Sequence, residues 1–216
     1  MSVNISNVLY TIYHEDNRYA RIGNNNTDYS TSLNAVLGDF SDVILIHETI
    51  ECNSKVYIVN EIGICAFRSC QTINTIIIPS SVVKICYRAF DCSSLKSVIF
   101  KKDSRLKIIY GAAFYSTKIS KIEIPSSIET IGSAAFSKSL KAFYYCGSLE
   151  IKSQFFEGSN SKLTIYLSDQ NPVTDISPYI FHKSSNCQMP VDPICKSLYF
   201  KKERTISTIY FIIMIL

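Results

Sequence analysis

The sequence contains no tryptophan and only 7 glycines in 216 residues. Loops that cradle nucleotide phosphates are rich in glycine, so this scarcity argues against a nucleotide-binding site. The sequence also lacks Gly-x-Ser-x-Gly, the Walker loop and His-Glu-x-x-His. His14, Glu15 and Asp16 are adjacent titratable residues, but no nucleophile motif accompanies them, which favours a solvated loop. We therefore expect neither catalytic residues nor a cofactor.

A strong charge of one sign is absent as well. The 22 basic and 18 acidic residues leave a net charge of +4, which is far from the basic footprint that nucleic-acid binding requires. We therefore expect no nucleic-acid partner. Because 47% of the residues are hydrophobic, the chain has enough apolar material to form a core.

The spacing of the 8 cysteines does not fit a zinc site. No two of them are separated as Cys-x-x-Cys, and the 3 histidines lie far from any cysteine pair, so we expect no metal ion. Free, buried thiols are the default in a reducing compartment. Disulfides would form if the chain were exported, but the sequence alone does not pair the cysteines.

Neither end of the sequence carries a complete export or membrane signal. The first residues lack the positive and apolar regions of a secretory signal peptide. The run from Ile206 to Leu216 is strongly apolar, but it is much shorter than the roughly 20 residues that span a bilayer. It is interpreted as a last packed element, a truncated anchor or the product of a wrong gene model. Membrane association therefore stays open.

The most informative feature is an internal repeat. Ala-Phe pairs recur with their phenylalanines 23, 24 and 22 residues apart. Five positions before each phenylalanine stands an isoleucine, and the segments 78–82 and 124–128 share the pattern Ile-Pro-Ser-Ser followed by Val or Ile. The phenylalanines are Phe67, Phe90, Phe114 and Phe136, and the isoleucines are Ile62, Ile85, Ile109 and Ile131.

A repeat of this length predicts a solenoid with one short strand in each unit. In the first complete unit, Ile76 and Ile78 would point inward and Thr75 and Ile77 outward, and the following proline would end the strand. One unit cannot bury its apolar side alone, but stacked neighbours can. We predict one curved parallel sheet, little regular helix and a stack of the four phenylalanines. The expected strands are 43–46, 75–78, 97–100, 121–124, 142–145 and 163–167.

These units resemble the BspA-like leucine-rich repeats, which read Leu-x-x-Ile-x-Ile-Pro-x-Ser-Val-x-x-Ile-Gly-x-x-Ala-Phe-x-x-Cys. The matching residues run from Ile73 to Cys92 and again from Ile119 to Phe136, with Cys86 in place of the usual glycine. The resemblance implies a leucine-rich-repeat solenoid. Cys70 and Cys92 stand at the family's cysteine position, where we expect buried, structural side chains.

The resemblance also suggests how the chain is organised. It indicates a cap or flanking region over 1–42 and a solenoid over 43–167. Residues 168–216 match nothing and form a C-terminal tail that ends in the short apolar segment.

The expected functional surface is the outward, concave side of the strands. An exposed apolar and aromatic stripe usually marks a partner-binding site, although strands also favour such residues for their own sake. The residues that we expect to contact a partner protein are Leu45, Ile77, Ile99, Lys121, Glu123, Tyr144 and Tyr166.

The resemblance implies a surface antigen that acts in cell adhesion and in the binding of host or partner proteins. It therefore implies a location at the cell surface. The lack of a signal peptide leaves a cytoplasmic scaffold that uses the same face as the alternative. Two further hypotheses are an enzyme whose site lies around His182 in 168–216, and a truncated gene copy without a present partner.

Overall fold

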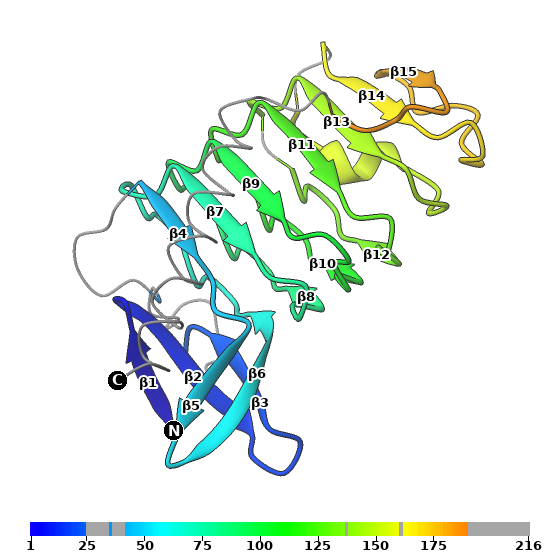
Figure 1. Ribbon diagram of the computed structural model, residues 1–216. Coiled ribbons are helices and arrows are strands. Elements are labelled where there is room, and N and C mark those ends of the chain that lie inside the picture. The colour runs from blue at the N-terminus through cyan, green and yellow to red at the C-terminus, as the bar shows by residue number, and fades with distance from the viewer. Residues whose placement is uncertain (25–34, 36–41, 137, 160–161, 190–216) are drawn as a thin grey trace, which may run out of the picture.

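The computed structural model describes residues 1–24, 35, 42–136, 138–159 and 162–189 (Figure 1). Strands dominate this part of the chain, and its one helical element is the 3-10 turn η1 (Ser153–Phe156). The prediction of a mainly β solenoid with little regular helix is confirmed. No helix among these residues is long and apolar enough to cross a membrane. The apolar run from Ile206 to Leu216 lies outside the described residues.

One side of the solenoid is built from short strands that lie next to one another along the array (Figure 1). Every hydrogen-bonded pair among them is parallel. The six predicted strands are all present, and a seventh, β15, pairs with β14 and carries the ladder past residue 167. The strands are β4 (Val43–Leu45), β7 (Thr75–Ile78), β9 (Ser97–Phe100), β11 (Lys121–Ile124), β13 (Ala142–Tyr145), β14 (Thr164–Leu167) and β15 (Ile180–Lys183).

The hydrogen-bonded ladder on this side is divided, whereas we expected one sheet. β4, β7 and β9 form one part, and β11, β13, β14 and β15 form the other. The starts of β7 and β9 are 22 residues apart, from 75 to 97, but those of β9 and β11 are 24 apart, from 97 to 121. The Lys118 N–H still donates to the Leu95 carbonyl oxygen at 2.9 Å just before β11. We attribute the break to the two extra residues, which take the two strands out of register.

The other side carries a ladder that is continuous with the N-terminal region. Three strands of two residues each, β8 (Lys84–Ile85), β10 (Ile108–Ile109) and β12 (Thr130–Ile131), pair in parallel. The order of the sheet is β1-β2-β3-β6-β8-β10-β12, and β5 pairs with β6. The flanking region is therefore fused to the solenoid by main-chain hydrogen bonds. The flanking region contributes β1 (Ser2–Ile5), β2 (Val8–His14) and β3 (Tyr19–Ile22), and the start of the solenoid contributes β5 (Thr49–Cys52) and β6 (Lys55–Ile62).

The predicted phenylalanine stack is confirmed. Phe67 and Phe90 have ring centroids 5.2 Å apart and planes 1° apart, and Phe90 and Phe114 follow at 5.1 Å and 2°. Phe136 continues the stack at 6.0 Å from Phe114. All four rings are buried. The stack therefore forms the axis of the core between the two ladders.

The turns that hold these rings repeat in detail. The residue before each Ala-Phe pair has a left-handed backbone, with φ of 54° at Cys65 and 53° at Arg88. The main chain then bonds from one turn to the next, because the Phe67 N–H donates to the Ala89 oxygen at 2.7 Å and the Phe90 N–H to the Ala113 oxygen at 2.8 Å. These bonds satisfy backbone groups that the stacked turns bury.

An ion pair between half-buried Arg21 and buried Glu61 joins the flanking region to the first turn of the solenoid. Arg21 on β3 contacts Glu61 on β6 at 3.2 Å, and the guanidinium also lies 4.2 Å from the centre of the Tyr13 ring. Burial, followed by the nearby Glu61 carboxylate, raises the pKa of the Cys86 thiol. Cys86, which stands where the repeat usually has glycine, therefore holds a neutral thiol that packs beside this pair.

The cysteines differ from the sequence-based expectation at three positions. Cys70 is buried as predicted, but Cys92 is exposed and donates its S–H to the Asp91 carboxylate at 3.1 Å. Cys146 and Cys187 form a disulfide instead of remaining free. The two lie 41 residues apart in sequence and meet because the chain turns back after β15, which the repeat pattern did not contain. Cys195 lies outside the described residues.

Candidate partner-binding face

We call the outward surface of β4, β7, β9, β11, β13 and β14 the strand face. Ile76 and Ile78 are buried in the core, as are Ile122 and Ile124, so the residues between them point away from it. The strand register predicted from the sequence is therefore confirmed. All seven predicted site residues lie on these strands, and they fall into two groups because the ladder is divided.

The first group is an apolar row. Leu45, Ile77 and Ile99 are direct partners across β4, β7 and β9. Leu45 and Ile99 are half-buried, as expected for outward residues, but Ile77 is only 3% exposed. It does not belong to the core cluster that holds Ile76 and Ile78. Its flanks are covered by the two in-register neighbours, each about 4.8 Å away across the ladder. The expected exposure of Ile77 is therefore wrong, although its outward direction is right.

The second group is an aromatic row. Glu123, Tyr144, Tyr166 and His182 are direct partners across β11, β13, β14 and β15. The Tyr144 and Tyr166 rings stack with centroids 4.6 Å apart, and the His182 ring lies 5.6 Å from Tyr166. Tyr144 is 8% exposed, and this burial, followed by the neighbouring Tyr166, raises the pKa of its hydroxyl. The exposure expected of Tyr144 is thus also wrong.

His182 belongs to this row but was not among the predicted site residues. Its strand starts only 16 residues after β14, from 164 to 180, which breaks the period that revealed the other strands. Lys121 is exposed at the start of β11, and it lies beside the row because its partner across the ladder is Ala142.

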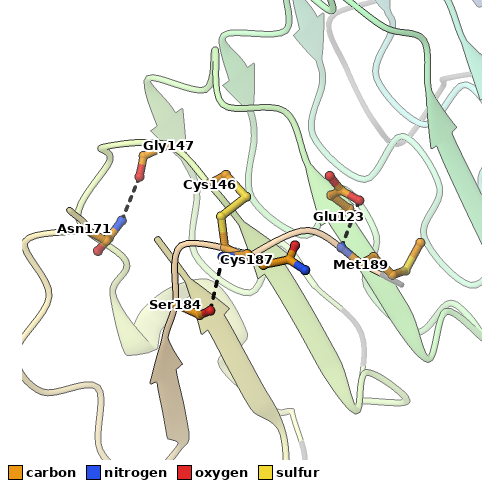
Figure 2. The surroundings of a disulfide bond; sticks show 8 residues. Glu123, Cys146, Gly147, Asn171, Ser184, Cys187 and Met189 are labelled. Atoms are coloured by element: carbon orange, nitrogen blue, oxygen red, sulfur yellow. Dashed lines mark hydrogen bonds between the residues drawn. A yellow bond between two sulfur atoms is a disulfide. The ribbon is translucent and has the colours of Figure 1, made fainter. Parts of the chain in front are cut away.

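A segment of the chain itself lies against the aromatic row. The Ser184 N–H donates to the Leu167 oxygen at 3.0 Å, and the Asn186 N–H donates to the Ser184 Oγ at 3.1 Å as the chain turns. The disulfide then ties Cys187 to Cys146 directly after β13, and the Met189 N–H donates to Glu123 Oε2 at 3.2 Å (Figure 2). We call residues 184–189 the cover segment. It reaches β11 from the far end of the array, so residues distant in sequence meet on the strand face.

Glu123 is half-buried beneath this contact. Burial raises the pKa of its carboxyl group, and the hydrogen bond from Met189 partly opposes that rise. The position of the carboxylate was predicted from the strand pattern. Its partner was not, because a pairing between two distant cysteines cannot be read from a single sequence.

The other two histidines lie away from the aromatic row. His14 is exposed at the end of β2 beside Glu15. The His47 N–H donates to the Tyr10 hydroxyl at 3.3 Å, and burial raises the pKa of Tyr10 to about 12. In the described part of the chain, no group of three or more His, Cys, Asp or Glu residues is placed to hold a metal ion.

Comparison with known proteins agrees with this architecture. The BspA type leucine-rich repeat region matches residues 60–188 in six copies. A leucine-rich repeat protein from Bacteroides capillosus ATCC 29799 has 23% identity and a TM-score of 0.53, over 67% of this chain and 97% of that one. The pneumococcal vaccine antigen PcpA has 20% identity and a TM-score of 0.54, over 86% of this chain and 51% of that one.

The leucine-rich repeat protein of T. pallidum shares the fold over almost the full length of both chains. It has 18% identity and a TM-score of 0.51, over 93% of this chain and 95% of that one. No curated protein matched the sequence. The matched repeats span more than half of the residues and include β15. The chain therefore belongs to the family of BspA-type leucine-rich repeat proteins.

Proposed function

We propose that this protein is a non-catalytic module that binds a partner protein through the strand face. The observation that carries the proposal is the pair of in-register rows, one apolar and one aromatic, that side chains of successive repeats form there. Leucine-rich repeat proteins are in general binding modules, and nothing in the described residues points to catalysis.

The chemistry of the two rows suits a protein surface. Leu45 and Ile99 offer apolar area at the edges of a buried isoleucine, which favours apolar side chains on the partner. Tyr166 adds a ring and a hydroxyl that lose little entropy on binding. Exposed Lys121 supplies a charge beside the aromatic row. Apolar contacts would supply affinity, and the tyrosine and lysine would restrict which partners fit.

We further propose that the partner is met at the cell surface, in adhesion or in recognition of a host protein. The Cys146–Cys187 disulfide supports this location, because disulfides persist in oxidising compartments. The free cysteines of the described residues favour the alternative of an intracellular scaffold. Protease treatment of intact cells separates the two. Cleavage without lysis supports the surface, and protection until lysis supports the scaffold.

Replacing Ile99 by aspartate is expected to abolish partner binding while leaving the fold intact. The side chain is half-buried on the strand face, so the new charge would remain hydrated in the free protein and lose its water in a complex. We expect capture of the partner from cell or host extracts to fall by more than about tenfold, as for a binding hot spot. Quantitative mass spectrometry of the captured proteins measures this.

Ile108→Asp is the matched control. Ile108 is also a half-buried strand isoleucine, but it lies on β10 on the other side of the solenoid. This variant should capture the same proteins as the wild type. Equal losses in both variants, or no loss in Ile99→Asp, would contradict the assignment of binding to the strand face.

A further inference from the structure

The cover segment occupies part of the surface to which the proposed function assigns binding. Met189 donates to Glu123, and Glu123 is the direct cross-strand partner of Tyr144. A partner that used this end of the aromatic row would therefore compete with the chain's own residues. Leu45 and Ile99 belong to the other part of the divided ladder.

We propose that the Cys146–Cys187 disulfide is a latch that keeps the cover segment on the β11–β13 part of the strand face, and that a dithiol opens it. The consequence for binding rests on the proposed function, but the latch itself does not. Opening would uncover Glu123, the cross-strand partner of Tyr144, and so enlarge the surface that a partner can contact.

The contacts of the cover segment show why the disulfide decides its position. Ser184, Asn186 and Gln188 are exposed, and Cys187 is buried at the point where it is bonded to Cys146. Among the described residues, a hydrogen bond from the Met189 N–H to the Glu123 carboxylate joins the end of the segment to β11. The covalent bond fixes Cys187 close to Met189 in sequence, so the Met189 N–H has a high effective concentration near the Glu123 carboxylate. Without the bond, the segment would depend on its attachment to β15, which ends at Lys183, four residues before Cys187.

The surroundings of the disulfide also define how it would be reduced. Cys146 is half-buried whereas Cys187 is buried, so we place the attack of the dithiol on the sulfur of the more exposed residue, Cys146. A thiolate of the dithiol attacks it, forms a mixed disulfide with Cys146 and expels Cys187 as a thiolate, which takes up a proton. The second thiol then closes the disulfide of the reagent and releases Cys146, which is protonated in turn. The protein gains two electrons and two protons, and the dithiol is oxidised.

Reduction should leave the strands beneath the cover segment in place. Ile122 and Phe143 belong to the buried core, and β11 and β13 are held by their own parallel ladder. Asn171, which is buried, donates from Nδ2 to the Gly147 oxygen at 3.1 Å (Figure 2). The same group also donates to the Leu149 oxygen at 3.0 Å. The chain on both sides of Cys146 is therefore fixed without the disulfide.

Hydrogen exchange of the full-length protein tests the latch without any partner. We expect exchange of the Met189 amide to accelerate by about tenfold or more when dithiothreitol is added under native conditions. Cys146→Ser should exchange equally fast without the reagent. Cys92→Ser, which alters an exposed cysteine outside the disulfide, should match the untreated wild type. Continued protection of the Ile122 and Phe143 amides would show that the fold is intact. If Cys146→Ser does not fold, reduction of the wild type still tests the proposal.

An unchanged Met189 exchange rate after complete reduction, verified by alkylation of both cysteines, would overturn the proposal. A faster rate supports it whether or not a partner is known. If the rate rises and capture of partner proteins does not, the latch stands and the proposed use of the aromatic row in binding fails. The two ideas can therefore fail separately.

Discussion

Replacing Phe90 by alanine is expected to lower the free energy of unfolding by about 3–5 kcal/mol, the usual cost of removing a buried aromatic side chain. Phe90 is 1% exposed and lies between two nearly parallel rings at 5.2 and 5.1 Å. Its loss leaves a cavity in the middle of the stack and removes contacts on both sides. Because repeats support only their neighbours, the damage would spread along the array. Urea unfolding, followed by circular dichroism, measures the change.

Phe100→Ala makes the same substitution at the end of β9, where the ring is only partly buried against the core. It should cost clearly less than Phe90→Ala. A Phe90→Ala protein with the unfolding midpoint of the wild type would show that the stack contributes no stability. The whole repeat interpretation of these rings would then be wrong.

Replacing Arg21 by alanine is expected to cost about 3–5 kcal/mol, because it leaves the Glu61 carboxylate buried without its counter-charge. The Glu61 side chain is 8% exposed and contacts Arg21 at 3.2 Å. The pair bridges β3 and β6, where the flanking region joins the solenoid. We therefore expect the N-terminal strands to lose protection first, and hydrogen exchange along the chain would show where the loss begins.

The control is the double replacement Arg21→Met with Glu61→Leu. Buried ion pairs replaced by apolar residues of similar size often leave stability unchanged. The double variant should therefore unfold close to the wild type. If the double variant were as unstable as Arg21→Ala, the cost would come from packing around the pair, and the charge argument would not hold.

The solenoid could be predicted because its repeat carries the same physical demands in each unit. The isoleucine before each Ala-Phe pair and the phenylalanine itself fill the same place in every turn, and all eight of these residues are buried. The alternation around Ile77 gave the strand register. The divided ladder was not predicted, because a repeat that is two residues longer still supplies the right core residues. Because side chains alternate with a period of two, a shift by two residues keeps each side chain on its own face, so the hydrophobic pattern does not reveal it.

The candidate site was predicted less completely. The positions of Glu123, Tyr144 and Tyr166 followed from the strand register, but their burial did not, because it depends on contacts between distant segments. His182, Cys187 and Met189 lie after the last strand that we predicted from the sequence, because the spacing of the strands shortens before β15. The family match nevertheless extends to residue 188. Cys92 was misassigned because its place in the motif does not reveal how its side chain points at that turn.

The divided ladder has a mechanical consequence. Where the ladder of the strand face is divided, β10 and β12 remain hydrogen-bonded on the other side of the solenoid, whereas β9 and β11 are not paired. Parting the first pair would break its ladder of main-chain bonds, whereas β9 and β11 have no such ladder and the Lys118–Leu95 bond lies just before β11. We therefore expect the array to bend most easily between β9 and β11, with the hinge on the side of β10 and β12. The apolar row, from Leu45 to Ile99, and the aromatic row, from Glu123 to His182, would then move as two rigid bodies. A partner that contacted both rows would set the angle between them.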